Sequence, residues 1–268
     1  MVFESLKNVQ EIRPLVHTIT NFVSMNDCAN ILLACGARPI MAEDCQEVPE
    51  ITAASDAVVL NLGTPNSSKY EAMKLAAETA SKKGIPIVLD PVGVGASSFR
   101  HNMARQFLQY PITLIRGNSA EIGALQDIPQ ERCGVDEAPH APEWEERILL
   151  AQALSAKTGA VVAMSGATDI VAFEKQVAFI HNGSPELSRI TGTGCMLSAL
   201  CGAFLAANPQ KFFAVISAFC MMGVCGQIAA EQAKNFGVGS MRTFLIDAVG
   251  NLTPETLERE AVYEFYKE

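Results

Sequence analysis

The sequence has little charge for its length. Of its 268 residues only 18% are Asp, Glu, Lys or Arg, against roughly 25% in an average soluble domain. Basic residues are the scarcer sign, 20 against 29 acidic ones for a formal net charge of −9, and they form no basic stripe. Nucleic acid is therefore an unfavourable partner. Because 49% of the residues are hydrophobic, a disordered chain is also excluded.

The eight cysteines lack the spacings that mark metal or redox motifs. None forms a CxxC pair, and none has a histidine at zinc-finger spacing. The chain also begins with charged residues, Glu4 and Lys7, where a secretory signal would have its apolar stretch. We therefore predict mostly buried, reduced thiols and a cytoplasmic protein.

Two long stretches, 191–210 and 212–230, have no charged residue at all. Each is about long enough to cross a bilayer, so a membrane hairpin is one interpretation. Against it, the stretches contain Asn208 and Gln227, are rich in Ala and Gly, and follow segments typical of a water-soluble α/β fold. The favoured prediction is a pair of fully buried helices and no membrane.

Apolar, β-branched segments alternate with segments of helical spacing over most of the chain. This alternation predicts an α/β fold with a mostly parallel central sheet and helices on both faces, formed by residues 1–268 as one domain. Residues 170–173 and 177–180 predict a hairpin at the sheet edge, 127–146 an irregular surface segment, and everything after Thr193 a helical C-terminal third. The expected strands are 15–20, 57–62, 85–90, 112–116 and 160–164, and the expected helices include 21–35, 66–83, 97–109 and one ending near 158.

Ligand sites of parallel sheets lie beyond the carboxyl ends of the strands. The residues at these ends are polar, charged or backbone-exposing in otherwise apolar surroundings. They are Asn21, Met41, Gly63, Asp90, Arg116, Ser165 and the glycine turn 192–194. A functional site is therefore expected at this edge of the sheet.

The strongest single motif is Thr191-Gly192-Thr193-Gly194-Cys195, which opens a long apolar helix. Two glycines let the backbone approach a ligand closely, and free amides at a helix start favour a phosphate or a developing negative charge. The motif is neither a Walker A loop, because no Gly-Lys-Ser/Thr follows, nor a GxGxxG after a first strand. A plain glycine turn is the alternative interpretation.

Two further segments add the other parts of a phosphoryl-transfer site. Asp90 ends the most apolar strand and starts a turn of proline and glycines, where a carboxylate could hold hydrated Mg²⁺ beside phosphates. Arg116 could bind phosphate through its planar guanidinium, and Glu121 offers a second carboxylate near the metal. A turn or capping aspartate and a surface ion pair are the respective alternatives.

Together the segments 15–21, 90–93, 116–121 and 191–195 resemble the hydroxyethylthiazole kinases of thiamine salvage, over nearly the whole chain. The resemblance implies a ribokinase-like fold, use of ATP and Mg²⁺ to phosphorylate the primary hydroxyl of 4-methyl-5-(2-hydroxyethyl)thiazole, and a homotrimer with sites at subunit interfaces. It also implies roles for single residues: Met41, Gly192 and Asn21 on the thiazole side, Arg116, Ser165 and Gly194 at ATP, and Asp90 and Glu121 near the metal.

Cys195 departs from the wider superfamily, in which the glycine motif usually ends in an aspartate that is taken to be the base. A thiol with a pKa of about 8.5, or lower at a helix N-terminus, is a poor acceptor for the proton of an alcohol. Because phosphoryl transfer is usually loose, the hydroxyl needs little deprotonation before the transition state. We therefore expect Cys195 to position the hydroxyl or to act as a weak base.

Three other functions share parts of this pattern. A kinase for the pyrimidine precursor of thiamine would share the glycine turn, but we expect aspartate at position 195 in such an enzyme. An ATP-dependent hydratase that repairs damaged nicotinamide cofactors uses a related fold and a similar turn. A nucleotide-sensing or assembly protein could keep the turn without turnover.

Overall fold

The computed structural model describes residues 2–127 and 144–266. Their strands form a nine-stranded sheet in the order β2-β1-β3-β4-β5-β6-β7-β8-β9. The first six strands in that order pair in parallel, and the last three pair antiparallel. The strands are β1 (Leu15–Ile19), β2 (Arg38–Ile40), β3 (Ala57–Asn61), β4 (Ile87–Asp90), β5 (Leu114–Asn118), β6 (Val161–Ser165), β7 (Asp169–Phe173), β8 (Gln176–Ile180) and β9 (Tyr263–Phe265). The predicted mostly parallel sheet is confirmed.

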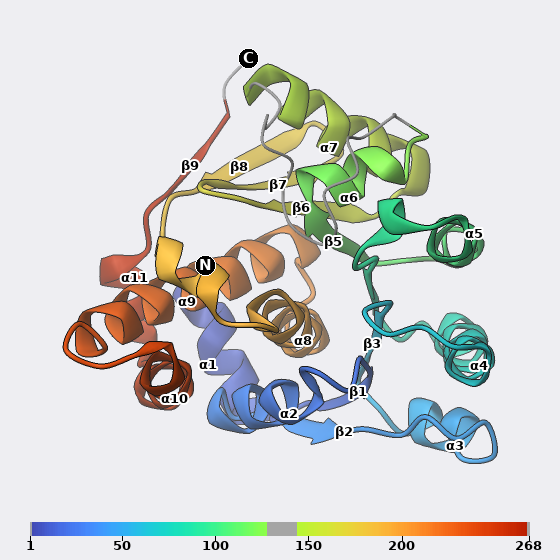
Figure 1. The fold of residues 1–268 in the computed structure, drawn as a ribbon, viewed down its shortest axis with the longest axis horizontal. Coiled ribbons are helices and arrows are strands. Elements are labelled where there is room, and N and C mark those ends of the chain that lie inside the picture. The colour runs from blue at the N-terminus through green and yellow to red at the C-terminus, as the bar shows by residue number, and fades with distance from the viewer. Residues whose placement is uncertain (1, 128–143, 267–268) are drawn as a thin grey trace.

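Helices cover both faces of this sheet (Figure 1). They are α1 (Val2–Ile12), α2 (Met25–Ala34), α3 (Val48–Ala53), α4 (Ser67–Lys83), α5 (Ser98–Phe107), α6 (Ser119–Ala124), α7 (Trp144–Thr158), α8 (Thr193–Ala207), α9 (Lys211–Gln232), α10 (Val238–Asn251) and α11 (Pro254–Glu260), with short 3₁₀ turns at Val94–Ala96 and Pro185–Arg189. On one face α8 contacts β1, β3 and β4 while α9 contacts β6, β7 and β8; on the other, α4, α6 and α7 contact β3 and β5 to β7.

The strands divide their side chains between two hydrophobic cores. In β3, Val59 faces the core that contains α8 and α9, whereas Val58 and Leu60 face the core that contains α4. Every residue of β3 is buried. A strand covered on both faces needs a continuous apolar run rather than an alternating one, which is the pattern that the sequence shows.

α8 and α9 are the two buried helices predicted from the uncharged stretches. α9 is long and apolar enough to cross a membrane, but 83% of its apolar window is buried inside the molecule. Its residues pack against α1, α8 and α10. The burial is that of a core helix, and it accounts for the absence of charge along this segment.

Three features differ from the sequence-based expectations. α2 begins at Met25, not at residue 21, because the side chain of Asn21 accepts hydrogen bonds from the backbone of Val23 and Ser24 and forms a turn there. The C-terminal third is not entirely helical, since β9 pairs with β8 and so covers the outer edge of the predicted hairpin. Most of the segment 127–146, expected to be irregular, lies outside the described residues, and its last three residues are helical because α7 begins at Trp144.

The parallel strands end at one edge of the sheet, and their registers align the last residues. Asn61 of β3 lies opposite Asp90 of β4. Asn118 of β5 lies opposite Ser165 of β6 in the same way. The edge expected to carry a ligand site therefore carries polar side chains on four adjacent strands.

Candidate active site

Asp90 lies at the centre of this edge and is 0% exposed. Its Oδ2 accepts hydrogen bonds from Nδ2 of Asn61 at 2.6 Å and from the hydroxyl of Ser198 at 2.8 Å. Its Oδ1 is buried and has no hydrogen-bond partner among the described residues. Burial raises the pKa of Asp90, while the nearby Arg116 charge opposes that shift. One carboxylate oxygen is therefore held by the protein and the other remains available.

Cys195 lies in the first turn of α8, close to Asp90. Its Sγ accepts hydrogen bonds from Nδ2 of Asn21 at 3.2 Å and from Nδ2 of Asn61 at 3.3 Å. Burial, followed by the charge of Asp90, raises the pKa of the Cys195 thiol. The pKa of the thiol is thus not lowered at this helix terminus, because desolvation and the neighbouring carboxylate both disfavour the thiolate.

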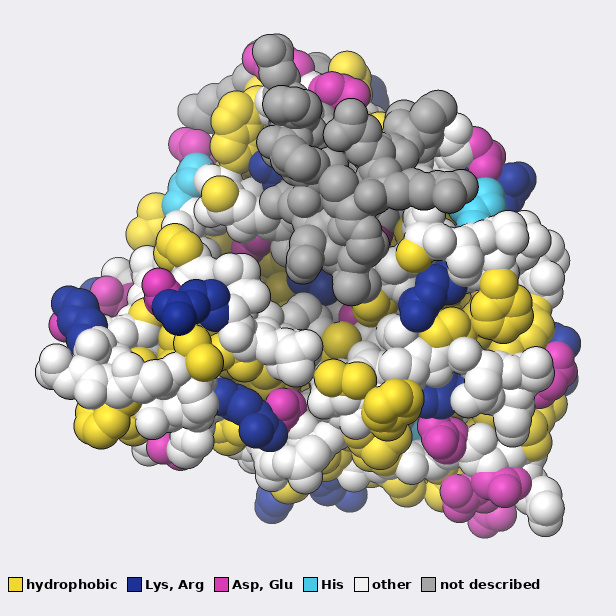
Figure 2. Space-filling view, in the orientation of Figure 1, with side chains coloured by type: hydrophobic (Ala, Val, Ile, Leu, Met, Phe, Trp, Pro, Cys, Tyr) yellow, Lys and Arg dark blue, Asp and Glu magenta, His cyan; other side chains and the backbone are white. Residues whose placement is uncertain are grey.

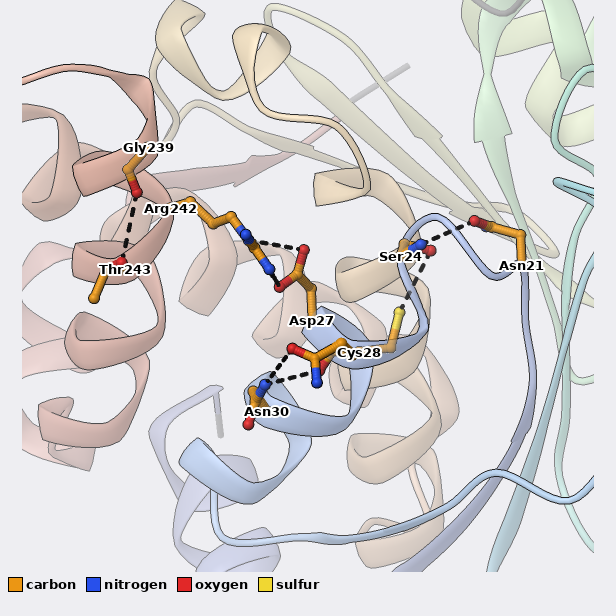
Figure 3. A network of polar contacts seen from close by, with 9 residues as sticks. Asn21, Ser24, Asp27, Cys28, Asn30, Gly239, Arg242 and Thr243 are labelled. Carbon is orange, nitrogen blue, oxygen red and sulfur yellow. Dashed lines mark hydrogen bonds and ion pairs between the residues drawn. The ribbon is translucent and has the colours of Figure 1, made fainter.

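Asn21 connects this cluster to the start of α2. Figure 3 shows its side chain directed toward Ser24, and its Oδ1 accepts from the backbone of Val23 and Ser24 at 3.1 Å each. One turn further, Asp27 of α2 binds Arg242 of α10 through both carboxylate oxygens. α2 is thus fixed at its N-terminal end, and the position of Asn21 with it.

The glycine motif brings the backbone close to two side chains. Gly192 has a φ of +87°, which favours glycine, and a Cβ there would lie 2.7 Å from Cβ of Ser24. A Cβ at Gly194 would lie 2.5 Å from Nη1 of Arg116. No side chain among the described residues caps α8. The turn is therefore more than a change of chain direction, since it packs the start of α8 against Ser24 and the Arg116 guanidinium more closely than a side chain would allow.

A cavity of about 790 Å³ opens beside the guanidinium of Arg116. Nη2 of Arg116 donates to the hydroxyl of Ser165 at 2.8 Å, whereas its Nε is buried without a partner in the described part of the chain. Gly194 and Ser165 also line the cavity, together with Leu197, Phe219 and Met222 from the buried helices. A volume of this size with a few polar groups and an apolar wall is typical of a small-molecule site.

Glu121 is not part of a surface ion pair, which was the alternative interpretation of its segment. It is buried, and its two carboxylate oxygens accept from the backbone N–H groups of Gly93 at 2.8 Å and Asn118 at 2.9 Å. Asn118 caps α6 in return, so the pair forms a capping box. Burial, with the Asp90 charge second, raises the pKa of Glu121 to about 7.

The carboxylates suit an open magnesium site better than a closed one. Among the described residues, no three His, Cys, Asp or Glu side chains gather as metal ligands. Mg²⁺ is commonly held by one or two carboxylates together with substrate phosphates. The unpartnered Oδ1 of Asp90 fits this arrangement, and Glu121 would act from beside it.

The structure brings together most, but not all, of the predicted site residues. Asn21, Asp90 and Cys195 share one network, and Arg116, Ser165 and Gly194 share the cavity. Met41 follows the edge strand β2 and packs, half-buried, against the core that also contacts Cys195. Its predicted contact with substrate remains a prediction.

Sequence reasoning missed two members of the network, Asn61 and Ser198. Asn61 is the polar last residue of a buried strand, and the apolar Leu62 after it concealed the strand end. Ser198 lies three residues after Cys195, so both project from one side of α8. Helical spacing from Cys195 was the signal that could have found Ser198.

Comparison with known structures defines first the class of protein. A ribokinase-like superfamily protein from Enterococcus faecalis V583 superposes with a TM-score of 0.61 over 96% of this chain and 89% of its own, at 14% sequence identity. The fold is therefore ribokinase-like.

Closer relatives define the family. The sequence model of the hydroxyethylthiazole kinase family matches residues 6–255. A hydroxyethylthiazole kinase from Clostridium acetobutylicum is 44% identical over 99% of this chain and 100% of its own length. The structure of a hydroxyethylthiazole kinase protein from Pyrococcus horikoshii OT3 has a TM-score of 0.89 at 36% identity, over 99% of each chain. The chain belongs to the hydroxyethylthiazole kinase family.

Proposed function

We propose that the protein uses ATP and Mg²⁺ to phosphorylate the primary hydroxyl of 4-methyl-5-(2-hydroxyethyl)thiazole in thiamine salvage. The observation that carries this proposal is the convergence at the start of α8 of a thiol, a buried carboxylate and a guanidinium that faces the cavity. Membership of the family supports the choice of acceptor. Cysteine at position 195 favours it over the pyrimidine alcohol.

The residues divide the work of phosphoryl transfer between two sides. On the nucleotide side, Arg116, Ser165 and Gly194 bind the phosphates of ATP, and the free amides of 192–195 stabilise charge that develops on the transferred group. A bound Mg²⁺ would neutralise phosphate charge, with Asp90 and Glu121 as the residues beside it.

On the acceptor side, the thiazole alcohol lies between Met41 and Gly192 with its hydroxyl at Cys195, and Asn21 borders this position. The raised pKa of the Cys195 thiol keeps it protonated at neutral pH. Its role is therefore to align the hydroxyl for in-line attack, a positional contribution that suits a loose transition state.

We also propose that residues 1–268 act as one kinase domain in the cytoplasm and assemble as a homotrimer with sites at subunit interfaces. The sheet joins β2 near the N-terminus to β9 near the C-terminus, which supports one domain. Phe22 and Val23, directly after Asn21, are 76% and 52% exposed, and apolar side chains reach the surface in several places in Figure 2. An apolar pair beside the site supports an interface there.

A coupled ADP-release assay tests the proposed reaction. The thiazole alcohol, the pyrimidine alcohol and hydrated NADH are offered separately, with and without Mg²⁺. Of the three acceptors, we expect only the thiazole alcohol to cause Mg²⁺-dependent ADP release. Equal release with and without that alcohol contradicts the substrate, and no release with any acceptor favours a protein that binds nucleotide without turnover.

Sedimentation of the same preparation tests the assembly. We expect a trimer, and replacement of Phe22 by Ser to shift it toward smaller species with a parallel loss of activity. A fully active monomer at all working concentrations contradicts both the trimer and the interfacial sites.

A further inference from the structure

Asn61 has a buried side-chain amide that contacts both the Asp90 carboxylate and the Cys195 thiol. It ends β3, directly opposite Asp90 of β4 in the parallel pairing. Its Nδ2 donates to Oδ2 of Asp90 at 2.6 Å and to Sγ of Cys195 at 3.3 Å. Its Oδ1 accepts from Nδ2 of Asn21 and from the backbone N–H of Gly63, at 2.9 Å each. Both donors and both acceptor positions of the amide are therefore used.

The surrounding groups determine which way this amide faces. The backbone N–H of Gly63 can only donate, so the oxygen of Asn61 must face it. The nitrogen must then face Asp90 and Cys195. The same reasoning applies to Asn21, whose oxygen faces the N–H groups of Val23 and Ser24 and whose nitrogen faces Cys195. Two amides thus direct N–H groups at one sulfur.

We propose that Asn61 is a positioning residue of the phosphoryl-transfer site, holding the Cys195 thiol and the Asp90 carboxylate in a fixed relation to each other. The inference rests on the proposed function, because it assigns those two groups to acceptor alignment and to phosphate and metal binding. Asn61 reaches neither the cavity lining nor Arg116 in the contacts described above, so it acts through its neighbours.

This arrangement predicts different effects of Asn61 on kcat and on KM for ATP. Asn61 fixes Oδ2 of Asp90, so Oδ1 is the oxygen that stays without a partner among the described residues. Loss of the amide leaves Oδ2 of Asp90 with Ser198 alone and Sγ of Cys195 with Asn21 alone, so both groups are held less firmly. Misplacement by about 1 Å can lower turnover by about 100-fold. The hydrogen-bond partners of Asn61 do not line the Arg116 cavity, where ATP is proposed to bind. The effect should therefore fall on kcat and leave KM for ATP unchanged.

The test compares Asn61→Ala and Asn61→Asp with a matched control, Asn208→Ala. Asn61 and Asn208 are both buried, and the side chain of Asn208 makes three hydrogen bonds, with Ser5, Phe204 and Asn8, at the end of α8 opposite to Cys195. Asn61→Asp keeps the size of the side chain, removes the N–H donors and places a second carboxylate against Asp90. Each variant is checked for native circular dichroism and a cooperative thermal transition before steady-state kinetics.

We expect kcat of both Asn61 variants to fall by about 100-fold, with KM for ATP unchanged. Asn208→Ala should lose thermal stability but retain its kcat. Because Asn61 acts through Cys195, its replacement should cost less in a Cys195→Ala background. If Asn61→Ala does not fold, the near-isosteric Asn61→Asp carries the test. A folded Asn61 variant with normal kcat, an equal loss in Asn208→Ala, or full additivity with Cys195→Ala overturns the proposal. A different result, wild-type protein that does not phosphorylate the thiazole alcohol, contradicts the proposed function itself and is seen before any variant is measured.

Discussion

On the Cys195 side of the site the polar side chains bind one another, whereas on the Arg116 side they face a cavity. Asn61 uses all its hydrogen-bonding groups within the protein, and two amides hold the sulfur of Cys195. Across the start of α8, the Nε of Arg116 is buried with no partner among residues 2–127 and 144–266, beside a cavity of about 790 Å³.

This difference indicates which half of the site is preformed. Buried polar groups are normally hydrogen-bonded, and an unsatisfied one carries a cost of roughly 1–3 kcal/mol. In the acceptor half, Asn21, Asn61 and Cys195 bind one another, so their geometry is set before any ligand binds, while Oδ1 of Asp90 has no partner among the described residues. The nucleotide half leaves a donor for the ligand to satisfy, so part of its order should come with ATP. The predictions below test that division.

The largest expected effect is on Asp90, which belongs to both halves. In Asp90→Asn, the remaining oxygen can still accept from Asn61 and Ser198, but the carboxylate that would face the metal is lost. We expect activity to fall by roughly 1000-fold, about 4 kcal/mol of transition-state stabilisation. Because burial raises the pKa of Asp90, an uncharged side chain should leave the free energy of unfolding equal or higher. Steady-state kinetics and urea unfolding measure both quantities, with the surface variant Asp247→Asn as control.

A second prediction concerns the pH dependence of stability in the ligand-free protein. The folded-state pKa of Glu121, about 7, lies above its ordinary value of 4.5. The native state therefore binds more protons between these values, and its stability falls as pH rises through that window, by at most about 3 kcal/mol. Glu121→Gln should remove this decline, while it weakens the cap of α6 at every pH. Urea unfolding at pH 5 and pH 8 measures the change, and an unaltered slope in the variant would show that Glu121 does not titrate there.

Arg116 tests the open half. Arg116→Ala removes charge-assisted hydrogen bonds to phosphate worth roughly 1.5–3 kcal/mol, so KM for ATP should rise by about 10-fold to 150-fold. Thermal stability should change less than ATP kinetics, because in the described part of the chain this side chain makes one hydrogen bond, to Ser165, beside its charge interaction with Asp90. Arg105→Ala is the matched control, since Arg105 is exposed and pairs with Asp127 at the surface. A variant that loses thermal stability but keeps normal ATP kinetics would make Arg116 structural.

The two halves also differ in how far the sequence predicts them. Strand ends could be read locally: Asp90 and Arg116 follow apolar runs, and parallel pairing brings such ends together. Asn61 could not be assigned in this way, because its importance depends on the β3–β4 register that places it opposite Asp90. The raised pKa of the Cys195 thiol could not be predicted from the sequence for a similar reason, since burial depends on the whole fold and Asp90 is distant in sequence.

The C-terminal strand shows the same limit of local reasoning. β9 has only three residues, two of them exposed, and its partner β8 lies about 80 residues earlier. No periodicity can be recognised in so short a segment, and its pairing is a long-range event. By contrast, the helix at 66–83 was predictable in detail because Asn66 caps its start and Gly84, with a φ of +68°, ends it.

The smallest expected effect is on Cys195 itself, although it lies at the centre of the preformed half. Cys195→Ser keeps a hydroxyl between the two amides, and its loss of turnover should stay well below the roughly 100-fold that removal of a general base costs. Cys195→Asp should be tolerated or improved, because the N–H groups of Asn21 and Asn61 already point at this position and a carboxylate accepts them more strongly than sulfur does. Steady-state kinetics over pH 6 to 9, a search for phosphorylated protein, and Cys45→Ser as the control complete the measurement. A phosphocysteine would mean that the thiol is a nucleophile. An inactive but folded Cys195→Asp would mean that the amides are placed for a neutral thiol rather than for a carboxylate, so that Asp90 alone sets the charge of this half.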